Sequence, residues 1–209
     1  LVEPIQGEAW VIVPPAGYLK QARDICTKHN VLLVLDEIQT GFCRTGRMFC
    51  YQHEDVKPDV LLVAKALGGG IVPVSAVLSS KEIMGLFTPG THGSTFGGNP
   101  LACAVATAAL DVLIDEKLDK RAEEMGAYFM AKLRELRNPL FKEVRGKGLL
   151  IAVELTTAAG PARKYTEALM RGGLLAKETH STTIRFAPPL VITKEQVDEA
   201  MEIIKKVIV

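Results

Sequence analysis

The sequence predicts an α/β fold, and three observations lead to that prediction. Short apolar runs at 31–35, 60–64 and 74–78 are typical of buried strands. A segment with helical apolar spacing, Gly17 to Asn30, precedes the first of these runs. After Asn138-Pro139 the pattern changes to a new alternation of strand-like and helix-like segments, which indicates a small second domain.

The N-terminal elements follow from residue spacing. Apolar residues recur every three or four positions between Gly17 and Asn30, so we expect a helix there, followed by a strand at 31–35. The runs at 60–64 and 74–78 are rich in Val and Leu on both faces. Parallel strands between two layers of helices have that composition, and we therefore expect all three strands to be parallel and buried.

Two helices are expected next. Pro100 begins a helix of small residues that continues to about Asp115, and the segment 118–136 places apolar residues at i, i+3 and i+4 among charged ones. That second pattern predicts a connecting helix with one solvated face. We therefore divide the chain into a larger domain at 1–115, a connecting helix at 116–138 and a small C-terminal domain at 139–209.

The C-terminal domain is expected to mix both kinds of element. The stretch 144–155 is strand-like, and a helix is expected near 162–170. Short strands are expected at 184–186 and 190–192, and an amphipathic helix at 194–209.

Composition limits the classes of function. The chain has 209 residues, 48% of them hydrophobic, with 25 Lys plus Arg against 24 Asp plus Glu. The hydrophobic content argues against disorder. The nearly equal numbers of positive and negative residues create no strong electrostatic field, which argues against a nucleic-acid or anionic-membrane partner. No apolar run reaches the roughly 18 to 20 residues that span a bilayer. The four cysteines lack CxxC spacing, so we expect no metal site and a reducing compartment, either cytosol or mitochondrial matrix. The chain starts without Met or a targeting segment, and we expect an upstream half to be missing.

Asp36 and Lys65 are the first candidates for chemistry. Each follows an apolar run, and ligand-binding groups in open α/β sheets lie at such strand ends. We expect Lys65 to be buried at this strand end, which would favour the neutral amine, a nucleophile suited to Schiff-base formation. Gly68–Gly70 would let the backbone approach a flat cofactor. A lone lysine after a strand is nevertheless usually solvated, and an Asp-Glu pair is often a helix cap; each residue alone favours that simpler interpretation.

The neighbouring motifs favour a functional role for Asp36 and Lys65 over the simpler interpretation. They are LVLDEIQTG at 33–41, RTGR at 44–47, KPD at 57–59, AKALGGG at 64–70 and HGSTFGGNP at 92–100. In this order they resemble the class III aminotransferases, and among them the ornithine aminotransferase subgroup, over nearly all of the chain. The resemblance implies the fold of type I pyridoxal-phosphate enzymes: part of a large, mainly parallel sheet domain plus a small C-terminal α+β domain.

The resemblance also implies roles for single residues. Lys65 would form a Schiff base with pyridoxal 5'-phosphate and carry a proton, and Asp36 would pair with the pyridine nitrogen. Gln39 would lie beside the cofactor's 3' oxygen, while Ser94 and Thr95 would reach the phosphate in the partner subunit of a homodimer. From the residues alone, Gln39 is a turn residue and the two hydroxyls are ordinary loop groups.

The substrate follows from two further motifs, EPIQGE at 3–8 and IRFAPP at 184–189. By resemblance, Glu8 pairs with Arg185 while ornithine presents its side-chain amine, and releases it when 2-oxoglutarate binds. The products would be glutamate semialdehyde and glutamate. Motifs at 144–150 and 173–180 favour this substrate over N-acetylornithine or 4-aminobutyrate. Another alternative is an inactive truncated chain that acts only as a dimerisation partner, because the family's glycine-rich phosphate loop is not in this sequence.

Five other residues carry simpler expectations. Trp10 stands where the family usually has a small residue, and we expect it to pack in the core. Arg44 and Arg47 are expected to pair with carboxylates of the same protein. Lys177 and His180 are expected at a solvated domain edge.

Overall fold

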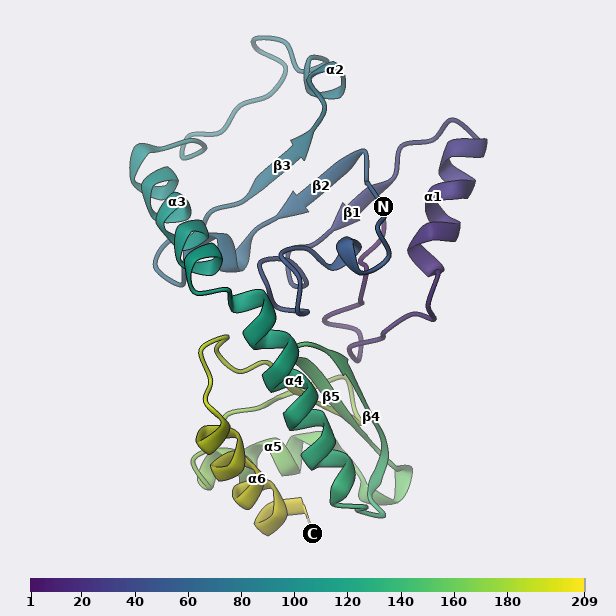
Figure 1. Cartoon of the computed structure of the whole chain (residues 1–209), viewed down its shortest axis with the longest axis vertical. Helices are drawn as coiled ribbons and strands as arrows, with labels where there is room; N and C mark the ends of the chain where they lie inside the picture. Colours follow the sequence, from purple (N-terminus) through teal and green to yellow (C-terminus); the bar gives the residue numbers. More distant parts are fainter. Residues whose placement is uncertain (209) are drawn as a thin grey trace. The chain divides into compact units, whose positions relative to one another are not determined.

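The computed structural model describes residues 1–208, which form two compact units described separately below (Figure 1). The first unit contains residues 1–4, 14–42 and 47–117. The second contains residues 5–13 and 43–46 and the segment that begins at Leu118. Among the described residues, no helix combines the length and the apolar character that crossing a bilayer requires.

The first unit is built on a three-stranded sheet of β1 (Val34–Asp36), β2 (Val60–Val63) and β3 (Ala76–Ser79). Strands β1 and β2 are parallel, as predicted, but β3 is antiparallel to β2. The prediction of a third parallel strand was wrong because only the 3-10 helix η2 (Lys65–Gly68) lies between β2 and β3, and a parallel connection needs a longer crossover.

Burial of these strands is also less complete than predicted. Val77 and Leu78 on β3 are 51% and 48% exposed. Strand β1 is shorter than the run 31–35, and Val31 and Leu32 are exposed. Val31 donates its backbone N–H to Cys26 O at 2.8 Å, so it still belongs to the turn that ends the preceding helix.

Helices α1 (Tyr18–Lys28) and α3 (Pro100–Asp115) confirm the predicted segments, and α2 (Lys81–Met84) and the 3-10 helix η1 (Cys50–His53) complete the first unit. Helix α3 starts where the sequence indicates, because the Asn99 side chain accepts a hydrogen bond from Ala102 N at 2.9 Å and Pro100 occupies the first turn. It packs against η2, the segment that begins with Lys65.

The second unit has an antiparallel sheet. Its strands, in spatial order, are β4 (Phe141–Lys147), β5 (Leu150–Leu155), β7 (Thr183–Phe186) and β6 (Lys177–Thr179). The strand-like stretch at 144–155 is therefore a hairpin, and β7 confirms the strand expected at 184–186.

Two details of this sheet differ from the prediction. The sequence did not predict β6, and residues 190–192 are a turn instead of a strand. Ile192 donates its N–H to Pro189 O at 3.1 Å. Pro188 and Pro189 lack the N–H groups that a strand needs, which explains why the apolar residues after them do not pair.

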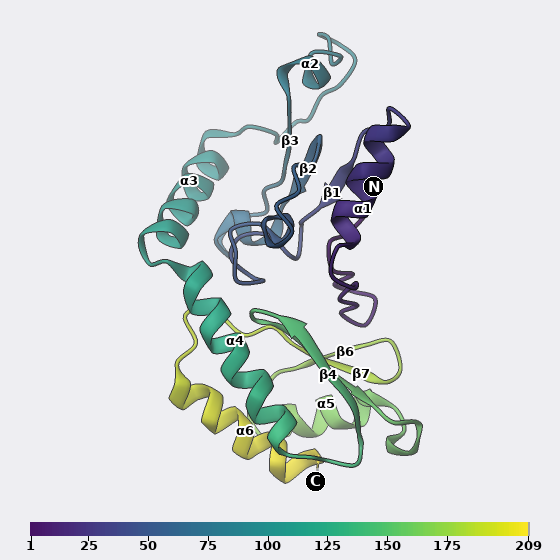
Figure 2. The ribbon, with the colours of Figure 1, turned by 45° about the vertical axis from the view of Figure 1, so that its right-hand side comes forward.

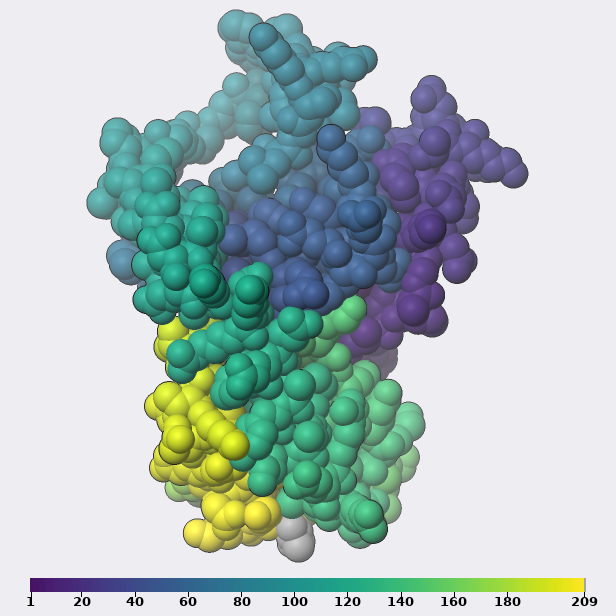
Figure 3. All heavy atoms as spheres, viewed as in Figure 1, coloured from purple at the N-terminus to yellow at the C-terminus, as the bar shows by residue number. Residues whose placement is uncertain are grey.

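Helices α4 (Leu118–Glu135), α5 (Ala162–Arg171) and α6 (Lys194–Ile208) lie along one side of this sheet, and η3 (Thr157–Ala159) precedes α5 (Figure 2). Alternate residues of β5, namely Ile151, Val153 and Leu155, are buried against them. Helix α4, expected as a connector, contributes Phe129 and Leu133 to this core. Figure 3 shows α6 in yellow beside α4 on the surface of the unit.

Glycines bring three segments of the second unit into backbone contact. A Cβ atom on Gly126 in α4 would overlap the backbone of Gly148, in the turn between β4 and β5. A Cβ atom on Gly148 would in turn lie 2.7 Å from Arg44 O. Leu149 N also donates to Arg44 O at 3.0 Å. The segment 43–46 belongs to this unit because its backbone packs directly on that turn.

Candidate active site

Asp36 and Lys65 lie at the same edge of the first unit's sheet. Asp36 is the last residue of β1 and is paired in register with Leu62 of β2, and Lys65 follows two residues after β2 ends. Because β1 and β2 are parallel, their carboxyl ends meet at one edge. The structure therefore places Asp36 and Lys65 at one edge of the sheet, although of the two only Lys65 lines the adjoining cavity described below. The Asp36 carboxylate also accepts a hydrogen bond from Ile38 N at 2.9 Å.

Lys65 is exposed, and the prediction that it is buried was wrong. Strand β2 ends at Val63, so Lys65 lies beyond the sheet as the first residue of η2. Its backbone φ of +47° is in the left-handed region, which is unusual for a residue with a side chain. The amine is thus accessible because of its position in the turn.

A cavity of about 470 Å³ in the first unit joins Lys65 to Ser94. Its lining consists of Ala64, Lys65, Pro73, Val74, Ser75, Ser94, Phe96, Gly97, Gly98, Asn99, Ala102 and Cys103. Thr95 is exposed and is not part of this lining. The structure thus brings one of the two predicted loop hydroxyls to the same cavity as the lysine.

The loop that carries Ser94 is held by local hydrogen bonds. Gly97 N donates to Ser94 Oγ at 2.9 Å, and the Asn99 side-chain amide donates to Phe96 O at 2.8 Å. Asn99 also caps α3, so it fixes the loop to the helix. Asn99 was not predicted as a site residue, although an Asn immediately before Pro100 is a recognisable helix start.

Glu37, next to Asp36, has a structural environment. Its side chain is fully buried and accepts hydrogen bonds from Cys50 N at 2.6 Å, Tyr51 N at 2.8 Å and Thr40 Oγ1 at 3.2 Å. Burial raises the pKa of Glu37, and these hydrogen bonds partly oppose that shift. Glu37 ties the segment after β1, which includes the half-buried Gln39, to η1.

Glu8 and Arg185 form an ion pair within the second unit. Arg185 Nη1 lies 3.3 Å from Glu8 Oε2 and also donates to Gly7 O at 3.1 Å. Arg185 extends from β7 and its side chain is only 17% exposed, whereas that of Glu8 is 68% exposed. The arginine is therefore fixed in the sheet, and the glutamate has the freedom to move away from it.

Arg44 and Trp10 differ from expectation. Arg44 donates to two backbone carbonyls, Leu149 O at 3.2 Å and Pro188 O at 2.6 Å, instead of pairing with a carboxylate. Burial, with a smaller contribution from nearby Arg185, lowers the pKa of Arg44 to about 10. Trp10 is 39% exposed and does not pack in the core; its ring lies 4.3 Å from that of the exposed His180. Lys177 is exposed, as expected for a domain edge.

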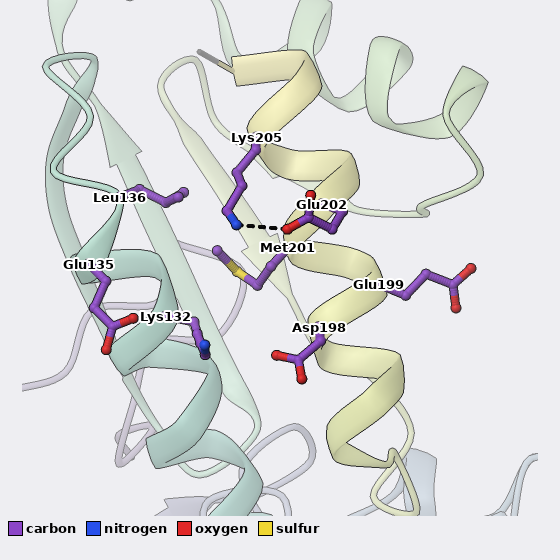
Figure 4. Close-up of a pocket in the computed structure, with 8 residues that line it drawn as sticks. All are labelled: Lys132, Glu135, Leu136, Asp198, Glu199, Met201, Glu202 and Lys205. Carbon is purple, nitrogen blue, oxygen red and sulfur yellow. Dashed lines mark hydrogen bonds and ion pairs between the residues drawn. The ribbon is translucent and has the colours of Figure 1, made fainter.

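A second cavity, of about 570 Å³, lies between α4 and α6 (Figure 4). Its lining is mostly charged, and Lys205 forms a 2.7 Å ion pair with Glu202 inside it. Asp198, also in the lining, accepts a hydrogen bond from the Tyr128 hydroxyl. The lining has two lysines and four carboxylates and so carries an excess of negative charge, and no residue that the sequence selected for chemistry lines this cavity.

Comparison with known proteins assigns the family. The chain matches the family Aminotransferase class-III over residues 1–208. It is 62% identical to ornithine aminotransferase of Brevibacillus brevis over 208 residues, which is 100% of this chain and 51% of that protein. It is 56% identical to ornithine aminotransferase 2 of Staphylococcus saprophyticus, over 99% of this chain and 52% of that one. The chain spans about half the length of the curated relatives it matches.

Solved structures agree with this assignment. The ornithine aminotransferase from Toxoplasma gondii ME49 superposes with a TM-score of 0.96 at 52% identity, over 99% of this chain and 50% of that one. Acetylornithine aminotransferase from Elizabethkingia anophelis gives a TM-score of 0.94 at 54% identity, over 99% of this chain and 53% of that one. Similarity to structures therefore extends over the whole described chain.

Proposed function

Because the chain belongs to the class III aminotransferases, we propose that Lys65 and Asp36 form the reactive centre of an aminotransferase that uses pyridoxal 5'-phosphate. The observation that carries this proposal is the position of both residues at the carboxyl ends of adjacent parallel strands. Ornithine is the proposed amino donor and 2-oxoglutarate the acceptor, giving glutamate semialdehyde and glutamate.

The residues at the sheet edge fit this cofactor. Lys65 offers an exposed amine beside a cavity, and Asp36 offers a carboxylate at the same edge. When bound, the cofactor supplies an aldehyde that condenses with amines and a ring that accepts electrons. Lys65 would hold it covalently and transfer a proton at the substrate carbon that bears the amino group. Asp36 would keep the ring nitrogen protonated.

Three other residues would complete the contacts. Gln39 would lie beside the 3' oxygen, and Ser94 and Thr95 would donate hydroxyl hydrogen bonds to the phosphate held in the partner subunit of a homodimer. Ser94 lines a cavity together with Lys65 of its own chain, which supports a position of this loop near a bound cofactor. The contact with the phosphate of the partner subunit follows from the family resemblance alone. We propose that Ser94 and Thr95 act on the cofactor of the partner subunit and not on that of their own.

The pair of Glu8 and Arg185 supports ornithine as donor. While Glu8 is paired with Arg185, the charge of the guanidinium is neutralised. The carboxylate of the donor is then not attracted to Arg185, and the donor can present its side-chain amine. When Glu8 moves away, the planar guanidinium is free to bind a carboxylate of 2-oxoglutarate. The exposed Glu8 side chain and the mostly covered Arg185 side chain, 68% and 17% exposed, are consistent with these two roles.

Acetylornithine aminotransferase is the second candidate, because a solved structure of that name is 54% identical to this chain. The full-length protein, loaded with cofactor and given no acceptor, distinguishes the two. We expect ornithine to remove the absorbance of the cofactor's imine band rapidly and N-acetylornithine or 4-aminobutyrate to do so slowly. A faster loss with N-acetylornithine would overturn the choice of ornithine.

The role of Lys65 is tested by borohydride reduction of the cofactor-loaded protein followed by peptide mapping. We expect the label on Lys65, and we expect Lys65→Ala to lose both the label and transamination. Lys57→Ala, which removes another exposed lysine of the first unit, should keep both. A Lys65→Ala protein that still transaminates would show that the proposed mechanism is wrong.

A further inference from the structure

The turn that carries Glu8 is closed and conformationally unusual. Gln6 and Ile12 exchange two backbone hydrogen bonds of 3.1 Å, and Trp10 N donates to Glu8 O at 3.0 Å. Trp10 and Val11 have φ values of +60° and +52°, although Val11 is β-branched and completely buried. Such residues rarely adopt the left-handed conformation, so the surrounding structure must hold this turn in place.

Two arginines on one row of the sheet hold the turn. Arg145 on β4 lies opposite Ala152 on β5, and Ala152 lies opposite Arg185 on β7. Residues directly opposite in adjacent strands point to the same face, so the two arginines flank a small side chain. Arg185 contacts Gly7 O and Glu8 at one end of the turn. Arg145 donates to Trp10 O at 2.6 Å and to Val11 O at 3.1 Å at the other end.

Arg145 is itself fixed by carboxylates. Its Nη1 lies 2.5 Å from Glu154 and 2.8 Å from Glu143, and its side chain is only 12% exposed. Lys142 also pairs with Glu154 at 2.6 Å. The guanidinium is planar, so carboxylates on one of its nitrogens orient the others toward the two carbonyls. The strained residues of the turn are therefore bound to a rigid group on β4.

We propose that Arg145 is a positioning residue for substrate preference, which holds the Gly7–Val11 turn so that Glu8 reaches Arg185. This inference rests on the proposed function, because it gives Glu8 its role in neutralising Arg185. Loss of Arg145 would release the carbonyls of Trp10 and Val11, and the turn would no longer keep Glu8 on the arginine. The half-reaction with ornithine would become less efficient, whereas the half-reaction with the diacid would not.

The test uses Arg145→Gln in the full-length protein and measures each half-reaction separately. We expect KM for ornithine to rise about tenfold, the size expected for one lost charge-assisted hydrogen bond, with kcat within about twofold of the unchanged protein. KM for glutamate should not rise. Arg145→Lys should restore part of the loss, because it keeps one charged donor. Arg134→Gln is the matched control: Arg134 also donates to a backbone carbonyl, Val144 O, but it does not contact the turn.

A double-mutant cycle separates positioning from a general structural role. If Arg145 acts through Glu8, the Glu8→Gln/Arg145→Gln protein should match Glu8→Gln alone in KM for ornithine. Fully additive effects, or equal losses in both half-reactions, would overturn the inference. If Arg145→Gln does not fold, the same cycle is run with Arg145→Lys. Failure of the unchanged protein to use ornithine would instead overturn the proposed function.

Discussion

At the scale of single residues, Asp36 and Glu37 show how neighbours in sequence divide two tasks. Successive side chains at a strand end point in opposite directions. Asp36 lies at the sheet edge beside β2, the strand that precedes Lys65, whereas Glu37 turns inward and becomes fully buried. The inward carboxylate binds the backbone of η1 and so supports the segment that follows Asp36. The position of the proposed functional carboxylate, Asp36, thus depends on the structural carboxylate of Glu37.

Replacing Glu37 with Leu tests this support. The buried N–H of Cys50 and the partly buried N–H of Tyr51 would lose their acceptor, and an unsatisfied buried group costs about 1 to 3 kcal/mol. We expect the free energy of unfolding of the first unit to fall by about 2 to 4 kcal/mol, measured by urea denaturation. Glu82→Leu, at an exposed position of α2, should change it little. Equal stability of Glu37→Leu and the unchanged protein would contradict this account.

The sequence predicted the positions of site residues better than their surroundings. The strand ends at Asp36 and Lys65 were predictable because apolar runs mark strands. The exposure of Lys65 was not, because it depends on a turn that begins after β2 and on what packs over it. Trp10 is similar: its hydrophobicity suggested the core, but its left-handed backbone places the ring on the surface beside His180.

At the scale of elements, the glycine contact between α4 and the turn after β4 determines how closely the helix approaches the sheet. Gly126→Ala should stabilise an isolated helix by about 1 kcal/mol. In this protein the added Cβ would overlap the Gly148 backbone, which cannot move aside as a flexible side chain could. We therefore expect Gly126→Ala to lower the free energy of unfolding by about 2 kcal/mol or more, since overpacking of this kind costs roughly 1 to 3 kcal/mol.

The comparison variant for that prediction is Ala127→Gly, at the next and exposed position of α4. Helix propensity alone predicts a gain for Gly126→Ala and a loss of about 0.5 to 1 kcal/mol for Ala127→Gly. If packing dominates, both variants lose stability, and Gly126→Ala loses more. Thermal and urea denaturation of the two proteins decide between these outcomes, and a gain for Gly126→Ala would refute the packing argument.

Elements with local signals were predictable, and those set by tertiary pairing were not. Helix α3 begins at Pro100 because the capping Asn99 precedes it in sequence. Strand β6, with the sequence Lys-Glu-Thr, has no hydrophobic pattern and exists because β7 pairs with it. The antiparallel direction of β3 likewise depends on the connection after β2, which the apolar run itself does not encode.

At the scale of the whole molecule, the two units carry different parts of the proposed reaction. Asp36, Lys65 and Ser94 belong to the first unit, and Glu8 and Arg185 belong to the second. Each group is held within its own unit. The parallel strands position Asp36 and Lys65, local hydrogen bonds hold the loop of Ser94, and Arg185 on β7 contacts Gly7 and Glu8. Cofactor attachment and recognition of the acceptor should therefore respond to different substitutions.

Arg185→Gln in the full-length protein tests this separation. The variant loses the charged fork that would bind a carboxylate of 2-oxoglutarate, so we expect KM for the acceptor to rise at least about tenfold, as for a lost charge-assisted hydrogen bond. Borohydride labelling of Lys65 should remain complete, because Lys65 and Asp36 lie in the other unit. Loss of labelling in Arg185→Gln would show that the substrate arginine also supports the cofactor. An unchanged KM for 2-oxoglutarate would show that Arg185 does not bind the acceptor. The proposed reason for its pairing with Glu8 would then be wrong as well.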